Sequence, residues 1–511
     1  MSDPRPEYEV VIGLEVHVQL RTESKLFSPA PVSTGEAPNH CVHPICLALP
    51  GVLPVLNRRA VELAIRTALA THCVVHTRSV FARKNYFYPD LPKGYQISQY
   101  EEPIATGGWI EIRVEDGAGD NTTRRIGLTR IHMEEDAGKS IHDQDPTDTL
   151  LDYNRCGVPL IEIVSEPELR SAREAYLYMQ KIRQLVRYLG ICDGNMEEGS
   201  LRCDANVSVR PRGQEALGVK TEIKNMNSFR NVERAIDYEI KRQIRLLRRG
   251  DEVVHQTLLW DANEQVTRPM RSKEMAHDYR YFPDPDLAQV VVTRERLEEI
   301  RAALPELPDV RQTRFVETLK LPAYDAALLT EERGVADYFE ATLAALQKRT
   351  GASDPAQAKA VSNFVMTEVL RVLNERAIDV EAFPIDADRL AGLVHLRMEN
   401  KVSSSGAQEI FNAMLDDARE AETLAVAHNL LQVSDAGALL PVVEQVLEKH
   451  AGQVRVYLDG KQGLIGFFIG QVMRSFEGSP DPKLVRELLL QRLERRQGDR
   501  VRGREGEREK G

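Results

Sequence analysis

The sequence predicts an α+β protein. Its first part, to about residue 294, mixes strands with helices, and the remainder is almost wholly helical. Apolar and polar residues alternate over 12–20 and 201–210, which predicts strands that bury one face. Other segments of the first part space their apolar residues as helices do. After the Pro-rich stretch 282–286, the composition shifts to Ala, Leu, Glu and Arg, which favour helix.

The first predicted strand, residues 12–20, has an apolar face that carries Leu14, Val16 and Val18. Glu15 and His17 fall on the opposite face because side chains alternate along a strand. The strand over 201–210 repeats the pattern, with a polar face that includes Arg202, Asp204 and Asn206.

Three helices are predicted between and after these strands, over residues 57–72, 171–190 and 229–250. Ser171 followed by Glu174 has the spacing of a capping box. Gly190 and Gly250 follow the last apolar residues of the second and third helices, where glycine commonly ends a helix.

The organisation along the chain predicts four segments. Residues 1–294 form the mixed catalytic domain, 295–427 a helical domain, 428–496 a small helical tail domain, and 497–511 a disordered tail. Prolines between 305 and 384 interrupt the helical part. The last segment is rich in Gly, Arg and Glu and has almost no apolar residue, as disordered tails do.

The composition narrows the class of protein. Hydrophobic residues make up 42% and charged residues 28%, which is ordinary for a globular chain. The formal net charge of −11 excludes indiscriminate coating of nucleic acid or anionic membrane. The six cysteines are scattered, no signal peptide is visible, and no apolar run reaches membrane-spanning length. We therefore expect a reduced, cytoplasmic protein with no membrane partner.

Polar residues on strand faces are the strongest chemical signal. Glu15 with His17 and Asp204 with Asn206 place carboxylates beside an imidazole or an amide, a combination that suits a hard cation such as Mg²⁺ with phosphate ligands. An ordinary solvated sheet face is the alternative for either pair alone. Glu162 adds to the signal, because an acid inside the apolar run 160–164 is rare unless it is paired or metal-bound.

The segment His132–Ser140 ends in Gly-Lys-Ser, as a P-loop does, but the P-loop interpretation fails. Met133 stands where the first glycine would be. Glu134, Glu135 and Asp136 would repel the phosphates that such a loop binds. These carboxylates suit a metal better, and an acidic surface turn is the alternative.

Cations and aromatic residues are interleaved over 83–95 and again over 278–283, a mixture that binds phosphates and stacks bases. A Pro-bracketed loop with anchoring aromatic residues is the alternative. Lys220, Glu222 and Lys224 share one face of a further predicted strand and could offer cations to a nucleotide.

Cys41 and Cys46, with His40 and His43, form only part of a zinc loop, since a structural zinc needs four ligands. The sequence shows no serine-amidase signature and no Cys–His glutaminase pair. If the chain makes an amide, its nitrogen comes from elsewhere.

Six motifs taken in order resemble the B subunits of the tRNA-dependent amidotransferases, a family that the chain matches to about residue 496. They are Gly13–His17, Arg83–Asp90, His132–Ser140, Pro159–Pro167, Glu197–Asn206 and Asp278–Pro283.

The resemblance implies a cradle-like catalytic domain of antiparallel sheet with helices, then a helical domain and a tail domain that grip tRNA. It implies a carbon–nitrogen ligase with glutamine as amido-nitrogen donor. The ligase uses ATP and Mg²⁺ to phosphorylate the side-chain carboxylate of Glu-tRNA(Gln), Asp-tRNA(Asn) or both. The implied partners are an amidase (glutaminase) A subunit, which releases ammonia, a small C subunit, and the misacylated tRNA.

The motif match also implies site residues. The implied metal ligands are Glu15, His17, Glu135 and Glu162. The implied catalytic residues, which position ATP and the aminoacyl end, are Tyr86, Lys93, Asp204 and Asn206. Lys84, Arg202 and Lys224 are the implied cofactor-binding cations.

The chain departs from the family in one place, where many members carry a zinc framework. Ser28-Pro29-Ala30 stands where the first cysteine pair would be, and His43 replaces a cysteine before Cys46. We therefore expect no structural zinc. Two other functions stay open at this point: a non-catalytic tRNA-binding scaffold, and a metal-dependent hydrolase that acts alone.

Overall fold

The structure is a computed structural model that describes residues 7–115, 121–142, 144–270, 279–433, 435–476 and 479–508. It divides into two compact units, Met1–Pro308 and Asp309–Gly511. The first unit combines sheets with helices, and the described residues of the second form helices apart from one short strand pair. The predicted α+β fold is therefore confirmed.

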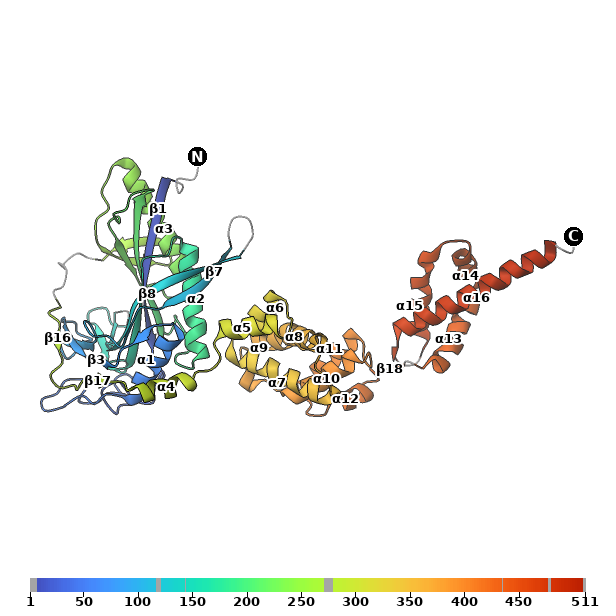
Figure 1. The fold of residues 1–511 in the computed structure, drawn as a ribbon, viewed down its shortest axis with the longest axis horizontal. Coiled ribbons are helices and arrows are strands. Elements are labelled where there is room, and N and C mark those ends of the chain that lie inside the picture. Colours follow the sequence, from blue (N-terminus) through green and yellow to red (C-terminus); the bar gives the residue numbers. More distant parts are fainter. Residues whose placement is uncertain are drawn as a thin grey trace. The chain divides into compact units, whose positions relative to one another are not determined.

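A ten-stranded sheet forms the frame of the first unit (Figure 1). Every strand pair in it is antiparallel except β13–β14. In spatial order its strands are β15 (Val266–Pro269), β14 (Thr257–Asp261), β13 (Thr221–Lys224), β12 (Leu201–Pro211), β1 (Tyr8–Gln19), β11 (Pro159–Ser165), β8 (Asn121–Glu135), β6 (Ala105–Thr106) and β2 (Val74–Val75), with β7 (Trp109–Glu115) paired to β8.

Smaller sheets complete the first unit. A three-stranded sheet joins β16 (Phe282–Pro283), β4 (Ala82–Asn85) and β5 (Tyr95–Ser98). It therefore brings together the two aromatic stretches that lie far apart in sequence. Two further strand pairs are β9 (Lys139–Ile141) with β10 (Leu150–Asp152), and β3 (Arg78–Ser79) with β17 (Val290–Val291).

The core lies on one face of the large sheet. Helices α1 (Arg58–Ala70), α2 (Ala172–Tyr188) and α3 (Phe229–Arg249) pack there, α1 against β2 and β8, α2 against β7 and α3 against β12. The apolar residues of β1, which include Leu14 and Val16, belong to the same core. Ser171 caps α2, since its Oγ accepts the Glu174 amide at 3.1 Å. Gly250 ends α3 in the left-handed conformation, with φ of 80°. The three predicted helices are therefore confirmed, and each ends within about two residues of the predicted position.

Helix α4 (Arg294–Ala302) belongs to the first unit, because Ile300 is buried in the first core. The sequence placed a boundary at 294, where the composition changes. The structure instead extends the compact unit to Pro308. The difference arises because a change in composition shows where helical sequence begins. It does not show which core the first of those helices packs against.

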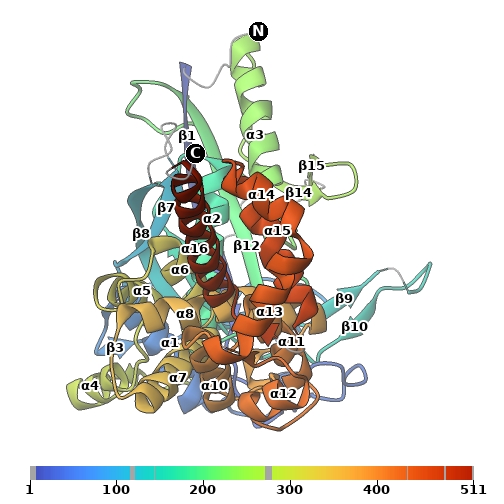
Figure 2. The same ribbon diagram turned by 90° about the vertical axis from the view of Figure 1, so that its right-hand side faces the viewer.

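The second unit contains two separate hydrophobic cores. The first is built by α5 (Pro308–Glu317), α6 (Ala323–Leu329), α7 (Arg333–Thr350), α8 (Pro355–Phe364), a π-helical turn (Val365–Val369), α9 (Leu370–Arg376), α10 (Ala387–Met398), α11 (Ser404–Met414) and α12 (Ala421–Ala427). The second is built by α13 (Ala436–Lys449), α14 (Ala451–Leu458), α15 (Ile465–Ser475) and α16 (Pro482–Arg508), which Figure 2 shows together.

Helix α16 differs from the sequence expectation, because its backbone continues to Arg508 through the segment predicted as a disordered tail. Arg, Gln and Glu are good helix formers, so a polar segment that follows a helix can extend it without a core of its own. Residues 509–511 lie outside the described residues.

Within the described ranges, no helix combines the length and the apolar character needed to span a lipid bilayer.

Candidate functional site

The open face of the large sheet carries a band of polar side chains across adjacent strands. β1 lies at the centre of the band, with His17 opposite Glu162 on β11 and opposite Arg202 on β12. Glu162 in turn lies opposite His132 on β8. Because the strands are in register, residues from four distant parts of the sequence form one continuous polar row.

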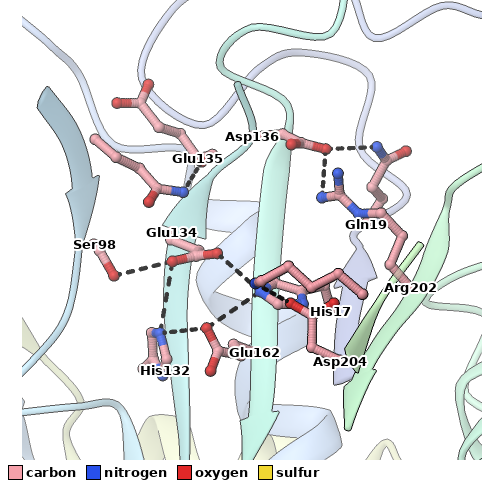
Figure 3. Close-up of polar contacts among 12 residues, drawn as sticks. His17, Gln19, Ser98, His132, Glu134, Glu135, Asp136, Glu162, Arg202 and Asp204 are labelled. Atoms are coloured by element: carbon pink, nitrogen blue, oxygen red, sulfur yellow. Dashed lines mark hydrogen bonds and ion pairs between the residues drawn. The ribbon is translucent and has the colours of Figure 1, made fainter. Parts of the chain in front are cut away.

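The centre of this band is a compact cluster of two acids and two imidazoles (Figure 3). His17 Nε2 lies 3.3 Å from Glu162 Oε2 and 3.7 Å from Glu134 Oε1. His132 Nε2 lies 3.3 Å from the same Glu162 oxygen and 3.6 Å from Glu134 Oε2. The Ser98 hydroxyl donates to Glu134 Oε2 at 3.2 Å, so that carboxylate is held on two sides.

The charges in the cluster support one another. Burial alone would lower the pKa of His132, but the Glu162 and Glu134 carboxylates raise it to about 9. The pKa of His17 is raised for the same reason, with Glu162 the main partner that opposes burial. The pKa of Glu162 lies well below its usual value, because the two imidazoles outweigh the cost of burying a carboxylate. Without a metal ion, the protonated imidazoles therefore compensate the two carboxylates, and a cation bound at His17 would displace the proton of that ring.

His17, Glu134 and Glu162 fit a divalent cation. Their nitrogen and carboxylate ligand atoms all lie within 4.8 Å of one another, and they are the one such group of three acids, histidines or cysteines in the described parts of the chain. One imidazole and two carboxylates suit Mg²⁺ or Mn²⁺ better than a soft thiolate metal.

Glu134 and Glu135 point to opposite faces of β8 (Figure 3). Glu134 faces the cluster. Glu135, which the sequence assigned to the metal, instead forms a buried ion pair with Lys93 and accepts the Ile97 amide at 3.0 Å. The structure therefore does not bring Glu135 or Lys93 to the cluster. Glu134 takes the place predicted for its neighbour.

A second group of polar contacts borders the cluster at the end of β1. Asp136 accepts hydrogen bonds from Arg202 Nη2 and Gln19 Nε2, both at 2.9 Å. Burial alone would raise the pKa of Asp136, but Arg202 and Arg155 hold it below its usual value. Arg202, predicted to bind the cofactor, is thus held at the edge of the polar band.

The other end of the band contains Glu15 and its neighbours. Asn206 Nδ2 donates to Glu15 Oε1 at 3.0 Å. Lys224 Nζ lies 2.7 Å from an Asp204 oxygen and 3.0 Å from a Glu222 oxygen. The sheet therefore brings Glu15, Asp204, Asn206 and Lys224 together with the cluster, as the shared strand faces predicted.

Lys84 and Tyr86 lie beside the cluster on the smaller sheet and in the loop that follows it. Lys84 Nζ lies 4.9 Å from the centre of the Tyr279 ring and 5.9 Å from that of Tyr86. Burial alone would lower the pKa of Lys84, but the nearby Glu134 carboxylate contributes most to raising it. Among the described residues, Lys84 forms no ion pair within contact distance. Asp278, which begins the second aromatic motif, lies outside the described residues.

Two other sequence interpretations can be placed in the structure. His132–Glu135 is part of strand β8, and Lys139 and Ser140 start strand β9, so this segment is not the loop and helix of a P-loop. Cys41 and Cys46 are buried, and Cys46 Sγ lies 3.4 Å from Ser28 Oγ and 3.9 Å from Lys25 Nζ. The absence of zinc stays a prediction.

Sequence reasoning grouped Glu134 with Glu135 and Asp136 as carboxylates that suit a metal but did not select it, and it missed His132, although the signal for both was present. The two residues are two apart, so a strand places them on one face, with Met133 and Glu135 on the other. Met133 is fully buried in the core, which fixes the direction of both faces. Treating 132–140 as a loop concealed this alternation.

Comparisons with known proteins identify the family of this chain. The GatB/GatE catalytic domain family matches residues 10–298, and the GatB domain family matches residues 337–493. A protein of Salinibacter ruber is 61% identical over 495 residues, which cover 96% of this chain and 97% of that protein. Proteins of Chlorobium limicola and Chlorobaculum tepidum are 54% and 53% identical, over 96% and 95% of this chain and 100% and 99% of their own lengths.

All three relatives are named as the B subunit of the aspartyl/glutamyl-tRNA(Asn/Gln) amidotransferase. The matched catalytic domain contains every residue of the polar band, from Glu15 to Lys224. This chain belongs to the family of amidotransferase B subunits that the resemblance indicated.

Proposed function

We propose that this chain uses ATP to activate the side-chain carboxylate of Glu-tRNA(Gln), Asp-tRNA(Asn) or both, as the B subunit of an amidotransferase. The names of its relatives support the substrates and the assembly. The observation that carries the proposal is the His17–Glu134–Glu162 cluster, a cation-binding group on the open face of the matched catalytic domain.

The reaction requires activation because a carboxylate resists attack by ammonia. An oxygen of the substrate carboxylate attacks the γ-phosphorus of ATP, the bond from that phosphorus to the bridging oxygen breaks, and ADP leaves. Ammonia then attacks the acyl carbon, phosphate leaves, and the amide forms after loss of a proton. Phosphoryl transfer depends mainly on positioning and charge stabilisation, which a polar sheet face can provide without a P-loop.

His17, Glu134 and Glu162 would hold Mg²⁺, which when bound supplies positive charge to the transferred phosphoryl group. His132 orients Glu162 and Glu134 from the far side, and Ser98 fixes Glu134. Such supporting contacts keep metal ligands in place.

Lys84 is the cation that we assign to the ATP phosphates. Its ammonium group is not neutralised by a contacting carboxylate among the described residues, and the rings of Tyr86 and Tyr279 hold it near Glu134. Arg202 and Lys224 border the site from β12 and β13, but each already pairs with an acid. Arg202 therefore positions Asp136, and Lys224 positions Asp204.

The ammonia would come from a partner amidase, the A subunit of the complex, which a small C subunit would complete. An outside source is needed because this sequence shows no amidase signature. We assign tRNA binding to the tail domain, which has a hydrophobic core of its own. Its surface carries exposed cations that can contact phosphates: Arg455, Lys461, Lys483, Arg486 and Arg495. Removing residues 435–511 should weaken tRNA binding in a filter-binding titration without unfolding the first unit.

The decisive experiment replaces the cluster's carboxylates in the assembled complex. Glu134→Gln and Glu162→Gln should each lower transamidation by about 10³-fold, because losing a metal ligand removes several kcal/mol of charge stabilisation. The glutaminase activity of the partner amidase should persist. Glu111→Gln, which removes a half-exposed acid paired with Arg125 on β7 and β8, is the matched control. Near-normal transamidation by both cluster variants would instead favour a non-catalytic scaffold.

A further inference from the structure

A pocket of about 310 Å³ opens on the polar face beside the cluster. It lies between β1, β11 and β12, and its apolar wall includes Val11, Val164 and Pro167. Its polar lining consists of Glu15, Ser165, Asn206, Ser208 and Lys220. Glu15 is the carboxylate in this lining, and it stands on the strand that also carries His17.

Glu15 forms no ion pair with a cation among the described residues. Asn206 donates a hydrogen bond to its Oε1 at 3.0 Å. Asp204 stands directly opposite Glu15 on β12, and Glu222 stands opposite Asn206 on β13, so further acids surround it. Two lysines lie nearby: Lys224 already contacts both Asp204 and Glu222, and Lys220 lines the pocket without an ion pair to Glu15 among the described residues. A carboxylate in this position is suited to bind a small cation at the mouth of the pocket.

The distance between Glu15 and the His17 cluster matches the size of an aminoacyl group, which carries a cation of its own. Glu15 and His17 are two residues apart on one strand face, which separates their Cα atoms by about 7 Å. An aminoacyl group of glutamate or aspartate carries its reacting carboxylate and its α-ammonium group only a few bonds apart. If the carboxylate lies at the His17 cluster, the α-ammonium group reaches Glu15.

We propose that Glu15 binds the α-ammonium group of the aminoacyl ester, and that the pocket accommodates the α-carbon end of that group. Glu15 then acts as a positioning residue, since it fixes the substrate's orientation without touching the reacting carboxylate. The proposal rests on the proposed function, because it assumes that the side-chain carboxylate lies at the cluster. It also explains how the enzyme would select an unblocked aminoacyl group.

The test compares two substrates in the assembled complex: Glu-tRNA(Gln), and the same tRNA after deamination of its aminoacyl group to the 2-hydroxy acid. For the wild-type enzyme, kcat/KM should fall about 10- to 100-fold with the deaminated substrate, because a charge-assisted hydrogen bond is lost. Glu15→Gln should show a similar fall with Glu-tRNA(Gln) and little further fall with the deaminated substrate. Glu9 stands on β1 with Glu15 and pairs with Arg210 on β12. As the control, Glu9→Gln should discriminate between the substrates as the wild type does.

Mn²⁺ binding by the same variants separates the possible outcomes. Glu15→Gln should bind Mn²⁺ with unchanged stoichiometry and affinity. If Glu15→Gln still discriminates between the substrates as the wild type does, the proposal is wrong. If it loses an equivalent of Mn²⁺, Glu15 holds a metal ion instead. A failure of the proposed function would look different, since Glu134→Gln would then remain active while Glu15 could still select the ammonium group.

Discussion

Glu134 and Glu135 are adjacent in sequence but occupy opposite kinds of environment. Glu135 has a buried lysine, Lys93, and a backbone amide as partners, so its charge is compensated within the fold. Glu134 shares its space with a second carboxylate, Glu162, and with two histidines. One acid completes the structure, whereas the other belongs to a cluster that is suited to bind a cation.

The comparison shows that burial of an acid does not by itself indicate function. Both side chains are almost fully buried, with 4% and 3% of their surface exposed. The difference lies in the partners. Glu135 pairs with a lysine that stays charged, whereas Glu134 and Glu162 share two imidazoles whose protons a metal ion can replace.

The most direct test of this difference between Glu134 and Glu135 removes the charge of Glu135 from its ion pair with Lys93. Glu135→Gln leaves the Lys93 ammonium group, 4% exposed, buried without a counter-charge. We expect the first unit to lose about 3–5 kcal/mol of unfolding free energy, measured by chemical denaturation. Glu134→Gln should cost less stability, because Glu162 still contacts both imidazoles and each imidazole can lose its proton, which a lysine does far less readily.

A double variant supplies the control for this prediction. Lys93→Met combined with Glu135→Leu removes both charges and should recover most of the stability lost in Glu135→Gln. Equal destabilisation by Glu134→Gln and Glu135→Gln would show that the two acids do not differ as proposed.

Lys84 and Lys93, both in the stretch 83–95, show the same difference between a compensated charge and an available one. Lys93 is paired with Glu135, whereas Lys84 lies between aromatic rings near the cluster. Lys84→Met should raise the KM for ATP about 10- to 100-fold, because it removes a charged contact to phosphate. Its folding should be nearly unchanged. Lys241→Met, in an exposed pair with Asp237 on α3, is the matched control, and an equal KM in both variants would contradict the assignment.

The sequence alone predicts much of the fold, because alternation and helical spacing are local signals. Strand β1, helix α2 and the glycine that ends α3 lie where their patterns predict. Within a single strand, the sequence also predicts which site residues share a face. Glu15 shares one with His17, and Asp204 shares one with Asn206.

What the sequence could not supply is the register between strands. Glu162 meets His17 and His132 only because β11 lies between β1 and β8, and no local pattern fixes that order. The motif match selected Glu135, but the pleat of β8 selects Glu134. Pairing partners such as Lys93 with Glu135 are likewise tertiary contacts, visible only after folding.

The smallest expected effect concerns a compensated acid in the helical unit. Glu340 on α7 accepts hydrogen bonds from Arg311 Nε at 2.9 Å and Arg314 Nη1 at 2.7 Å. Its side chain is 31% exposed, so solvent weakens these contacts, and Glu340→Gln should cost about 1–2 kcal/mol of stability.

Burial alone would raise the pKa of Glu340, but the two arginines lower it below 4.5. A depressed folded-state pKa contributes stability above the unfolded pKa, and that contribution is lost as the pH falls through the folded value. The difference in unfolding free energy between the wild type and Glu340→Gln should therefore be constant near neutral pH and shrink below about pH 4.5. Denaturant titrations at about pH 7 and about pH 3.5 measure both quantities. A difference that stays the same at both values would show that Glu340 is not held ionised by its arginines, and transamidation should be unaffected in either case.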